Sequence, residues 1–295
     1  MKKISFFALL GIIALTLFAC EKKQAANNEQ QSAQQEETIP ASFPRKHLIE
    51  EFTSQYCGYC PYYGMDFVHE FMSKDSNYIL VLHHAGFKAD NFTIKESSKT
   101  SSTLKVAGAP NVAIDRVKTT YMDEDVKKEV SETVFHPYYL SHLDLTQYAD
   151  TTYASVNIKN TYDPATRQLT VIVSGVVIPK DHPELNLSIF IKESGMIDIQ
   201  ADYIQTKNGW KEFRHTDAVR EYLTEFKGNQ LTMLDDHRYE LQYMTVLNEK
   251  WVADNCMVVA FLGEAFQPVI QVAEQPVVTG TKGGADIQHG GITKY

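Results

Sequence analysis

Two patterns of hydrophobic and polar positions divide the chain near residue 147. Before this point, short apolar runs alternate with segments in which apolar residues recur every three or four positions. Runs that are apolar on both faces are typical of strands covered by helices, and the three-to-four spacing indicates amphipathic helices. The first part therefore predicts an α/β domain over residues 43–146. Its expected strands are 48–52, 78–84 and 111–115, with a short fourth strand at 117–122.

The helices expected in this part follow from the same spacing. Met65, Val68 and Phe71 form one apolar stripe that can pack against a sheet. The polar stretch 86–103 predicts a loop with a short helix. Three acidic residues open the segment 121–140 and valines repeat at every fourth position after them, so a helix is predicted there as well.

After residue 147 the pattern changes to short strands separated by turns. About seven strands with little helix between them predict an all-β sandwich of immunoglobulin-like kind over 147–280. One interruption, 216–226, is typical of a short capped helix, and the tail 281–295 is expected to fray. The expected strands are 153–160, 169–178, 186–192, 196–204, 239–247, 256–262 and 269–278.

The first residues have the pattern of an export signal. Two lysines precede an apolar run that ends at Phe18 and is too short for a comfortable membrane span. With Leu-Phe-Ala-Cys at 17–20, the segment resembles a bacterial lipoprotein signal. The resemblance implies a signal peptide at 1–19, an acylated Cys20 and a lipid-anchored place at the outer membrane, on its periplasmic or its surface face. The alternative is an ordinary secretory signal with an incidental cysteine.

Composition predicts a tether and disfavours nucleic acid as a partner. Residues 20–42 are rich in Gln, Asn, Ala and Glu, which predicts a disordered tether. Removal of Lys2 and Lys3 with the signal leaves 26 of the 28 basic residues against 37 acidic ones, a formal net charge of −11. This sign disfavours nucleic acid as a partner. Export also places the cysteines in an oxidising compartment.

Candidate chemistry lies at Cys57 and Cys60, directly after the first predicted strand. Two cysteines three positions apart in the first turn of a helix can close a small disulfide. The open form presents the first sulfur to the unpaired amides of the helix start, where partial positive charge favours a thiolate. Cys57 is therefore the candidate attacking sulfur, and Cys60 the one that resolves a mixed disulfide. Pro61 fits a first turn because its missing N–H has no intrahelical acceptor there.

The spacing of this pair is also compatible with uses other than redox chemistry. It can form an inert structural disulfide. A zinc site would need further ligands, and His83 with His84 is the only candidate completion, although adjacent strand residues point to opposite faces. A c-type haem would need histidine directly after Cys60. We therefore expect neither a metal nor a cofactor.

The segment from Glu51 to Cys60 resembles the thioredoxin active-site segment, and the two match with no insertion or deletion. The resemblance implies a thioredoxin-like domain over 43–146 and makes Glu51 the buried acid that moves a proton to and from the resolving cysteine. The dipeptide Gly58-Tyr59 is the one found in periplasmic disulfide isomerases. Tyr59, held between the two sulfurs, is a candidate substrate contact.

A second segment, Val-Ala-Gly-Ala-Pro at 106–110, resembles the other thioredoxin signature. The resemblance makes Pro110 a cis-proline and Ala109 the residue whose backbone pairs with an incoming peptide. Cys256, by contrast, lies in an apolar strand and is expected to be a buried, unpaired thiol rather than a resolving or metal-binding one.

The whole arrangement resembles the Bacteroidetes outer-membrane lipoprotein family named for an apparent mass of about twenty-eight kilodaltons. The resemblance rests on residues 50–61 and 108–116 and on the end segments 255–261 and 271–274. Members pair a lipoprotein signal and a thioredoxin-like domain with a β-rich C-terminal domain. The implied fold class is an α/β thioredoxin-like domain followed by an all-β immunoglobulin-like sandwich.

Two functions are compatible with these features. The first is a thiol-disulfide oxidoreductase or isomerase that acts on thiols and disulfides of exported proteins, tethered through Cys20 and able to form a homodimer around a substrate cleft. The second is a surface antigen or adhesin-type binding protein in which the cysteine pair is a closed structural bridge.

Overall fold

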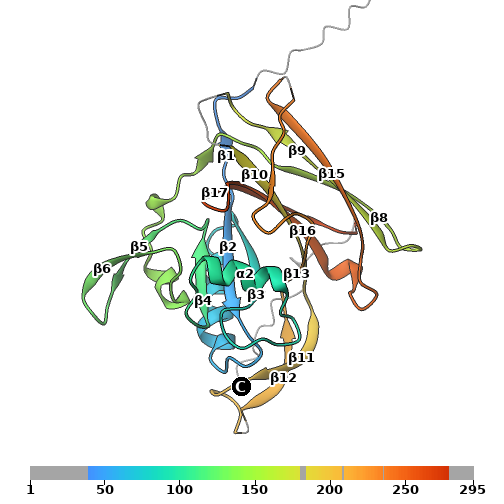
Figure 1. Cartoon of the computed structure of the whole chain (residues 1–295). Coiled ribbons are helices and arrows are strands. Elements are labelled where there is room, and N and C mark those ends of the chain that lie inside the picture. Colours follow the sequence, from blue (N-terminus) through green and yellow to red (C-terminus); the bar gives the residue numbers. More distant parts are fainter. Residues whose placement is uncertain (1–38, 180–183, 208, 235, 279–295) are drawn as a thin grey trace, which may run out of the picture. The chain divides into compact units, whose positions relative to one another are not determined.

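The computed structural model describes residues 39–179, 184–207, 209–234 and 236–278 (Figure 1). The expected signal peptide, Cys20, the tether up to residue 38 and the tail 281–295 lie outside these residues.

Strands from both parts of the sequence pair in one eight-stranded sheet. Its order is β17-β16-β10-β13-β3-β2-β4, and β14 pairs with β10 beside this path. The strands β2 and β3 are parallel, and β3 meets β13 in a parallel pairing of Leu82 with Ala218, whereas the other neighbours are antiparallel. The bounds are β2 His47–Thr53, β3 Tyr78–His84, β4 Asn111–Ile114, β10 Leu185–Glu193, β13 Ala218–Tyr222, β14 Asn229–Gln230, β16 Cys256–Glu264 and β17 Val269–Pro276.

Smaller sheets and short helices complete the described fold. A three-stranded sheet has the order β15-β9-β8, and β5-β6, β11-β12 and β1-β7 are two-stranded. Their bounds are β1 Phe43–Pro44, β5 Thr119–Asp123, β6 Lys128–Glu132, β7 Thr151–Thr152, β8 Asn157–Asp163, β9 Gln168–Val176, β11 Met196–Ala201, β12 Trp210–His215 and β15 Arg238–Val246. The helices are η1 Pro61–Asp66, α1 Phe67–Met72, α2 Lys95–Thr103, η2 Pro137–His142, η3 Leu145–Gln147 and η4 Ala253–Asn255.

Apolar clusters cover both faces of the large sheet. The sheet of β8, β9 and β15 packs on β10 and β16, where Val171, Leu187 and Val258 are fully buried together. At the edge of the large sheet that ends in β4, α1 and η2 cover one face of β2 to β4 through residues such as Phe71 and Leu140. Burial of this apolar surface is the main stabilising contribution to the fold.

The expected fold class, an α/β thioredoxin-like domain followed by a separate immunoglobulin-like sandwich, is wrong. The described chain is mostly β, in several sheets, and its helices are short. The strands β10, β16 and β17, which were expected in the sandwich, and β13, where a helix was expected, continue the sheet that contains β2 to β4. Hydrophobic patterns predicted most of these strands correctly, but they do not encode which strand pairs with which.

The helix predicted over 121–140 is also wrong, because β5 and β6 form a hairpin there. Tyr121 pairs with Val130 across the two strands. The carboxylate of Asp123 accepts the N–H groups of Asp125 and Val126, at 2.9 and 3.2 Å, and so builds the turn. A valine at every fourth position also fits a short strand, turn and strand, so the periodicity alone was ambiguous.

The helix predicted over 216–226 is replaced by β13. This strand pairs with β10, as in Phe190 opposite Tyr222, and fills the gap between β10 and β3. Its apolar residues, Ala218, Val219 and Tyr222, do not alternate with the partly buried Arg220 and Glu221 and instead fit the three-to-four spacing of a helix.

Candidate functional site

The strand β2 leads directly to the cysteine pair. Cys57 and Cys60 form a disulfide with their Cα atoms 5.4 Å apart, as predicted for this spacing. The π-helical turn η1 begins at Pro61, and Cys60 directly before it already has helical backbone angles, so Cys57 precedes the helix and Cys60 lies at its start. Cys57 is 5% exposed and Cys60 is 1% exposed, so Cys57 is the more accessible sulfur.

The turn before β4 brings a distant segment against the disulfide. The Ala109–Pro110 peptide bond is cis, as the resemblance implied. The Sγ atom of Cys57 lies 3.4 Å from the carbonyl oxygen of Ala109. The two motifs are therefore neighbours in space although about fifty residues separate them.

Glu51 lies beneath the helix that follows the disulfide. It is fully buried, and neither carboxylate oxygen has a hydrogen-bond partner. A Cβ atom at Gly64 would collide with Oε1 of Glu51 and lie 3.0 Å from the Cβ atom of Pro110, so these three residues meet. Burial, with added repulsion from Asp217 and Asp66, raises the pKa of Glu51 well above its ordinary value. The carboxyl group of Glu51 therefore stays protonated to a higher pH than that of an ordinary glutamate.

The preceding residue, Glu50, shows the opposite behaviour on the other face of β2. Arg116 donates to its two carboxylate oxygens at 2.7 and 2.8 Å, and Nε2 of His83 lies 3.0 Å from Oε1. Burial alone would raise the pKa of Glu50, but the charge and hydrogen bonds of Arg116 outweigh it and lower the pKa to about 2. Glu50 is therefore an ionised structural group, and Glu51 is the unpaired acid.

The β11-β12 hairpin covers the loop that carries the disulfide, and nothing in the sequence pattern indicated this. The N–H of Ala201 donates to the carbonyl of Gln55 at 2.7 Å, and the N–H of Tyr203 donates to that of Gly58 at 3.1 Å. The side-chain amide of Gln200 donates to the carbonyls of Ser54 and Cys57, at 3.2 and 2.9 Å. These bonds hold the backbone on both sides of Cys57. The carboxylate of Asp202 also accepts from the Tyr62 hydroxyl, 3.0 Å away, and pairs with Lys211 at 2.6 Å.

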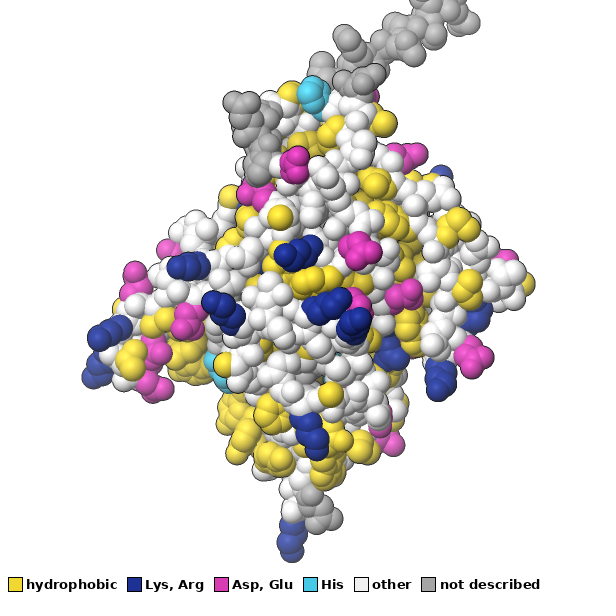
Figure 2. Space-filling model, viewed as in Figure 1, with side chains coloured by type: hydrophobic (Ala, Val, Ile, Leu, Met, Phe, Trp, Pro, Cys, Tyr) yellow, Lys and Arg dark blue, Asp and Glu magenta, His cyan; other side chains and the backbone are white. Residues whose placement is uncertain are grey.

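Aromatic and aliphatic side chains remain exposed around this cover. Tyr59 is 51% exposed, and its ring meets that of Tyr203 edge to face at 5.6 Å. The Tyr203 ring also lies where a Cβ atom of residue 58 would be, so the position suits glycine. Hydrophobic side chains gather at the lower edge of the view, where the hairpin lies (Figure 2). Large exposed hydrophobic residues of the hairpin and its turn are Ile197, Ile199, Tyr203, Ile204 and Trp210.

The two adjacent histidines have separate structural partners. His83 lies 2.9 Å from the Ser97 hydroxyl, whereas Nδ1 of His84 lies 2.8 Å from a carboxylate oxygen of Asp90. They are buried on opposite faces of β3, as expected for neighbours in a strand. Within the described residues, no group of three or more His, Cys, Asp or Glu side chains is arranged to hold a metal ion.

Cys256 is the free cysteine of the described chain, and it is remote from this chemistry. It is 1% exposed within the apolar cluster between the two sheets. Burial, with the nearby charge of Glu193, raises the pKa of its thiol to about 12. The expectation of a buried, unpaired thiol is confirmed.

The structure brings together the residues predicted for the site, and their roles stay predictions. Cys57 and Cys60 form the disulfide, Ala109 lies beside the Cys57 sulfur, and Glu51 and Pro110 both lie near Gly64 of the helix that follows. Tyr59 lies at the edge of the same surface. Sequence reasoning missed Gln200 and Tyr203, since only a predicted strand at 196–204 marked their segment. Lipid attachment at Cys20 falls outside the described residues.

Comparisons with known proteins give a family and a fold. The structure of HBP35 of Porphyromonas gingivalis is similar with a TM-score of 0.64 and 18% sequence identity, covering 84% of this chain and 80% of that one. This similarity shows a shared fold. A domain of the outer membrane lipoprotein Omp28 from the same organism gives a TM-score of 0.30 at 14% identity, covering 43% of this chain and 88% of that one.

No curated protein matches the sequence. In the part of the chain that the structure describes, no helix has the length and apolar character needed to cross a membrane. The family described as outer membrane protein Omp28 matches residues 97–281, which is more than half of the chain. The chain therefore belongs to the outer membrane protein Omp28 family, and this membership associates it with the outer membrane.

Proposed function

We propose that this protein is a thiol-disulfide oxidoreductase that acts on exported proteins at the outer membrane, to which a lipid on Cys20 anchors it. One arrangement carries the proposal. The more accessible sulfur, on Cys57, lies beside the carbonyl of Ala109, and the unpaired acid Glu51 and the neighbouring Pro110 both approach Gly64 of the helix that follows. An inert bridge has no use for a buried, uncompensated carboxyl group, which is costly to keep in a core.

The chemistry is a pair of thiol-disulfide exchanges. In the oxidised state, a thiolate of an exported protein attacks Cys57, which forms a mixed disulfide and releases Cys60 as a thiolate. Glu51 supplies the proton that Cys60 takes up. A second thiolate of the exported protein then displaces Cys57, so that protein gains a disulfide and the Cys57–Cys60 pair is reduced.

The return reaction restores the disulfide. The Cys57 thiolate attacks a disulfide of another exported protein, which forms a mixed disulfide and expels one thiolate of that protein. Cys60 then gives its proton to Glu51 and attacks the Cys57 sulfur, so the Cys57–Cys60 bond forms, the mixed disulfide breaks and the reduced exported protein leaves. Over one cycle, disulfides are exchanged between protein substrates without any cofactor. The backbone of Ala109 and the ring of Tyr59 hold the segment that carries the reacting cysteine.

Substitution of the attacking sulfur tests this function. Cys57→Ser should reduce the rate of insulin reduction by dithiothreitol, and of refolding of a scrambled disulfide protein, to the uncatalysed level. Cys256→Ala is the matched control and should keep the wild-type rate, because Cys256 is buried in the core. Equal rates for the wild type and Cys57→Ser would contradict the proposal.

A second candidate, a binding protein with a closed structural bridge, is favoured by the small exposed fractions of both cysteines and by the hairpin over Gly58. The reduction potential separates the two. A value near −180 to −120 mV, roughly that of folding catalysts, supports the oxidoreductase, whereas a value below about −300 mV supports the inert bridge.

A further inference from the structure

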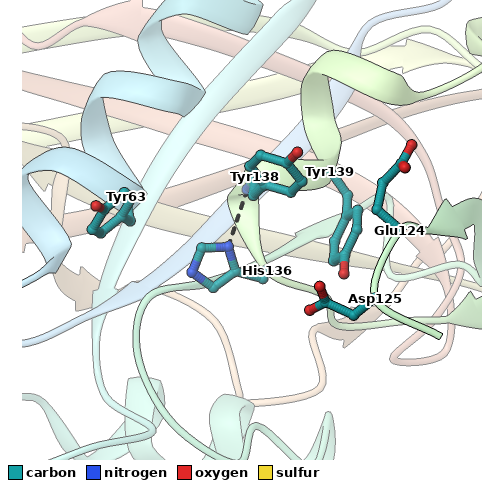
Figure 3. Close-up of a pocket in the computed structure, with 6 residues that line it drawn as sticks. All are labelled: Tyr63, Glu124, Asp125, His136, Tyr138 and Tyr139. Carbon is teal, nitrogen blue, oxygen red and sulfur yellow. Dashed lines mark hydrogen bonds between the residues drawn. The ribbon is translucent and has the colours of Figure 1, made fainter.

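A groove leads from the disulfide to the β5-β6 hairpin. Its first hollow, of about 490 Å³, is lined by Tyr59, Tyr63, residues 107–111 and His136. A second hollow, of about 460 Å³, lies between Tyr63 and the turn of the hairpin and is lined by Tyr63, Glu124, Asp125, His136, Tyr138 and Tyr139 (Figure 3). Because Tyr63 and His136 line both hollows, the two are direct neighbours, and the first one includes Ala109 beside the Cys57 sulfur.

The second hollow combines aromatic rings with carboxylates. Tyr63 and Tyr138 are each 42% exposed, and the Tyr138 ring meets that of Tyr139 edge to face at 5.3 Å. Figure 3 shows Glu124 and Asp125 beside Tyr139, across the hollow from Tyr63. Within the described chain, neither carboxylate forms an ion pair. Ring faces and carboxylates together attract a cation such as a lysine or arginine side chain.

His136 leaves this hollow without a positive charge of its own. Its Nδ1 atom accepts the N–H of Tyr138 at 3.1 Å, so the neutral ring carries its proton on Nε2. Burial also lowers the pKa of His136, which keeps the ring neutral at neutral pH. The carboxylates of Glu124 and Asp125 thus face no competing cation from the histidine.

We propose that this groove binds an extended, cation-bearing segment of the protein substrate, with a lysine or arginine side chain in the second hollow and the reacting cysteine near Cys57. The inference rests on the proposed function and gives it a substrate preference. A polypeptide suits the site because the cation-attracting hollow adjoins a second one that reaches Ala109, beside the Cys57 sulfur. A strand advances about 3.3 Å per residue, so a short extended segment can reach both hollows at once.

Peptide binding tests the groove independently of the redox chemistry. The binding of two fluorescein-labelled, cysteine-free peptides of about twelve residues to the full chain is measured by fluorescence anisotropy. Both share an apolar half, and the other half carries two arginines in one peptide and two glutamates in the other. The arginine peptide should bind about 5- to 20-fold more tightly, and 0.5 M NaCl should reduce this preference because salt screens exposed charges.

The carboxylates are then removed without changing the shape of the hollow. The double variant Glu124→Gln/Asp125→Asn should lose most of the preference for arginine. Glu129→Gln, an exposed carboxylate on β6 that does not line the groove, should keep it. The inference is overturned if the wild type binds both peptides equally. It is also overturned if the double variant and Glu129→Gln lose the preference for the arginine peptide to the same extent.

A kinetic arm separates this inference from the proposed function. The same peptides with one cysteine are reacted, as mixed disulfides with a small thiol, with the reduced protein. If the protein binds the arginine peptide more tightly but exchanges disulfides with neither peptide, the proposed oxidoreductase function is rejected and the binding preference of the groove stands. Exchange at equal rates for both peptides would support the oxidoreductase and overturn the substrate preference.

Discussion

Two cysteine environments in this chain differ in what surrounds the sulfur. The Cys57–Cys60 pair lies at the end of β2 under a hairpin, next to an unpaired acid and an exposed aromatic surface. Cys256 lies at the start of β16, among the apolar side chains that join two sheets. Both sites are buried by area. Neighbouring groups, rather than exposure alone, therefore distinguish a candidate reactive sulfur from a packing thiol.

The covers of the two sites also differ. Cys256 is enclosed by strands of the core, whereas Cys57 is covered by a two-stranded hairpin held through hydrogen bonds from Gln200 and from the backbone of Ala201 and Tyr203. The following predictions test this contrast.

The largest expected difference is in alkylation of the reduced, folded protein. Cys57 should react with iodoacetamide at least about 1,000-fold faster than Cys256, because a thiol with a pKa of about 12 has almost no thiolate at neutral pH. Mass spectrometry of peptides after timed quenching measures both rates. Unfolding in guanidinium chloride should bring the two rates close together. Rapid modification of Cys256 in the folded state would remove the contrast.

A smaller effect is expected from Glu51→Gln, which removes the titrating acid but keeps its size. Exchange should slow by about 10- to 100-fold, because the proton donor for Cys60 is lost. Unchanged exchange kinetics would show that Glu51 moves no proton.

The stability of Glu51→Gln should also depend on pH differently from that of the wild type. The folded pKa of Glu51 lies above its unfolded value near 4.5, so the folded state binds more protons and wild-type stability falls as pH rises from that value towards the folded pKa. The slope approaches about 1.4 kcal/mol per pH unit, and Glu51→Gln should lack it. Urea unfolding between pH 2 and 8 measures both proteins. Below the ordinary pKa of 4.5, both should lose stability together as pH falls towards 2, where Glu50 protonates. Parallel curves throughout would contradict the raised pKa.

The smallest effect is expected at the contact between hairpin and loop. Gly58→Ala places a methyl group in the Tyr203 ring and should lower the free energy of unfolding by about 1 kcal/mol, since such overpacking costs roughly 1–3 kcal/mol and the exposed ring can yield. In a Tyr203→Ala background the same change should cost nearly nothing, which a double-mutant cycle by urea unfolding measures. An equal cost in both backgrounds would show that the contact with Tyr203 does not cause the destabilisation by Gly58→Ala.

Local patterns predicted the site better than the fold. The strand before Cys57, the cysteine pair, the cis bond at Pro110 and the burial of Glu51 follow from residues close in sequence or from a resemblance to a short motif. The hairpin that carries Gln200 was recognised only as a strand. Its partner is a loop more than 140 residues away, and no short-range pattern encodes a contact of that separation.

By itself, the sequence determined where most strands lie, which cysteines pair and which thiol is buried, because these depend on apolar runs and on spacing within a few residues. Only the tertiary structure decided that both parts of the chain share one sheet, that 121–140 is largely a hairpin and that aromatic rings and carboxylates meet in one groove. The physical reason is that a strand or a side chain gains its stabilisation from the partners it finds across the fold, and many pairings are compatible with the same hydrophobic pattern.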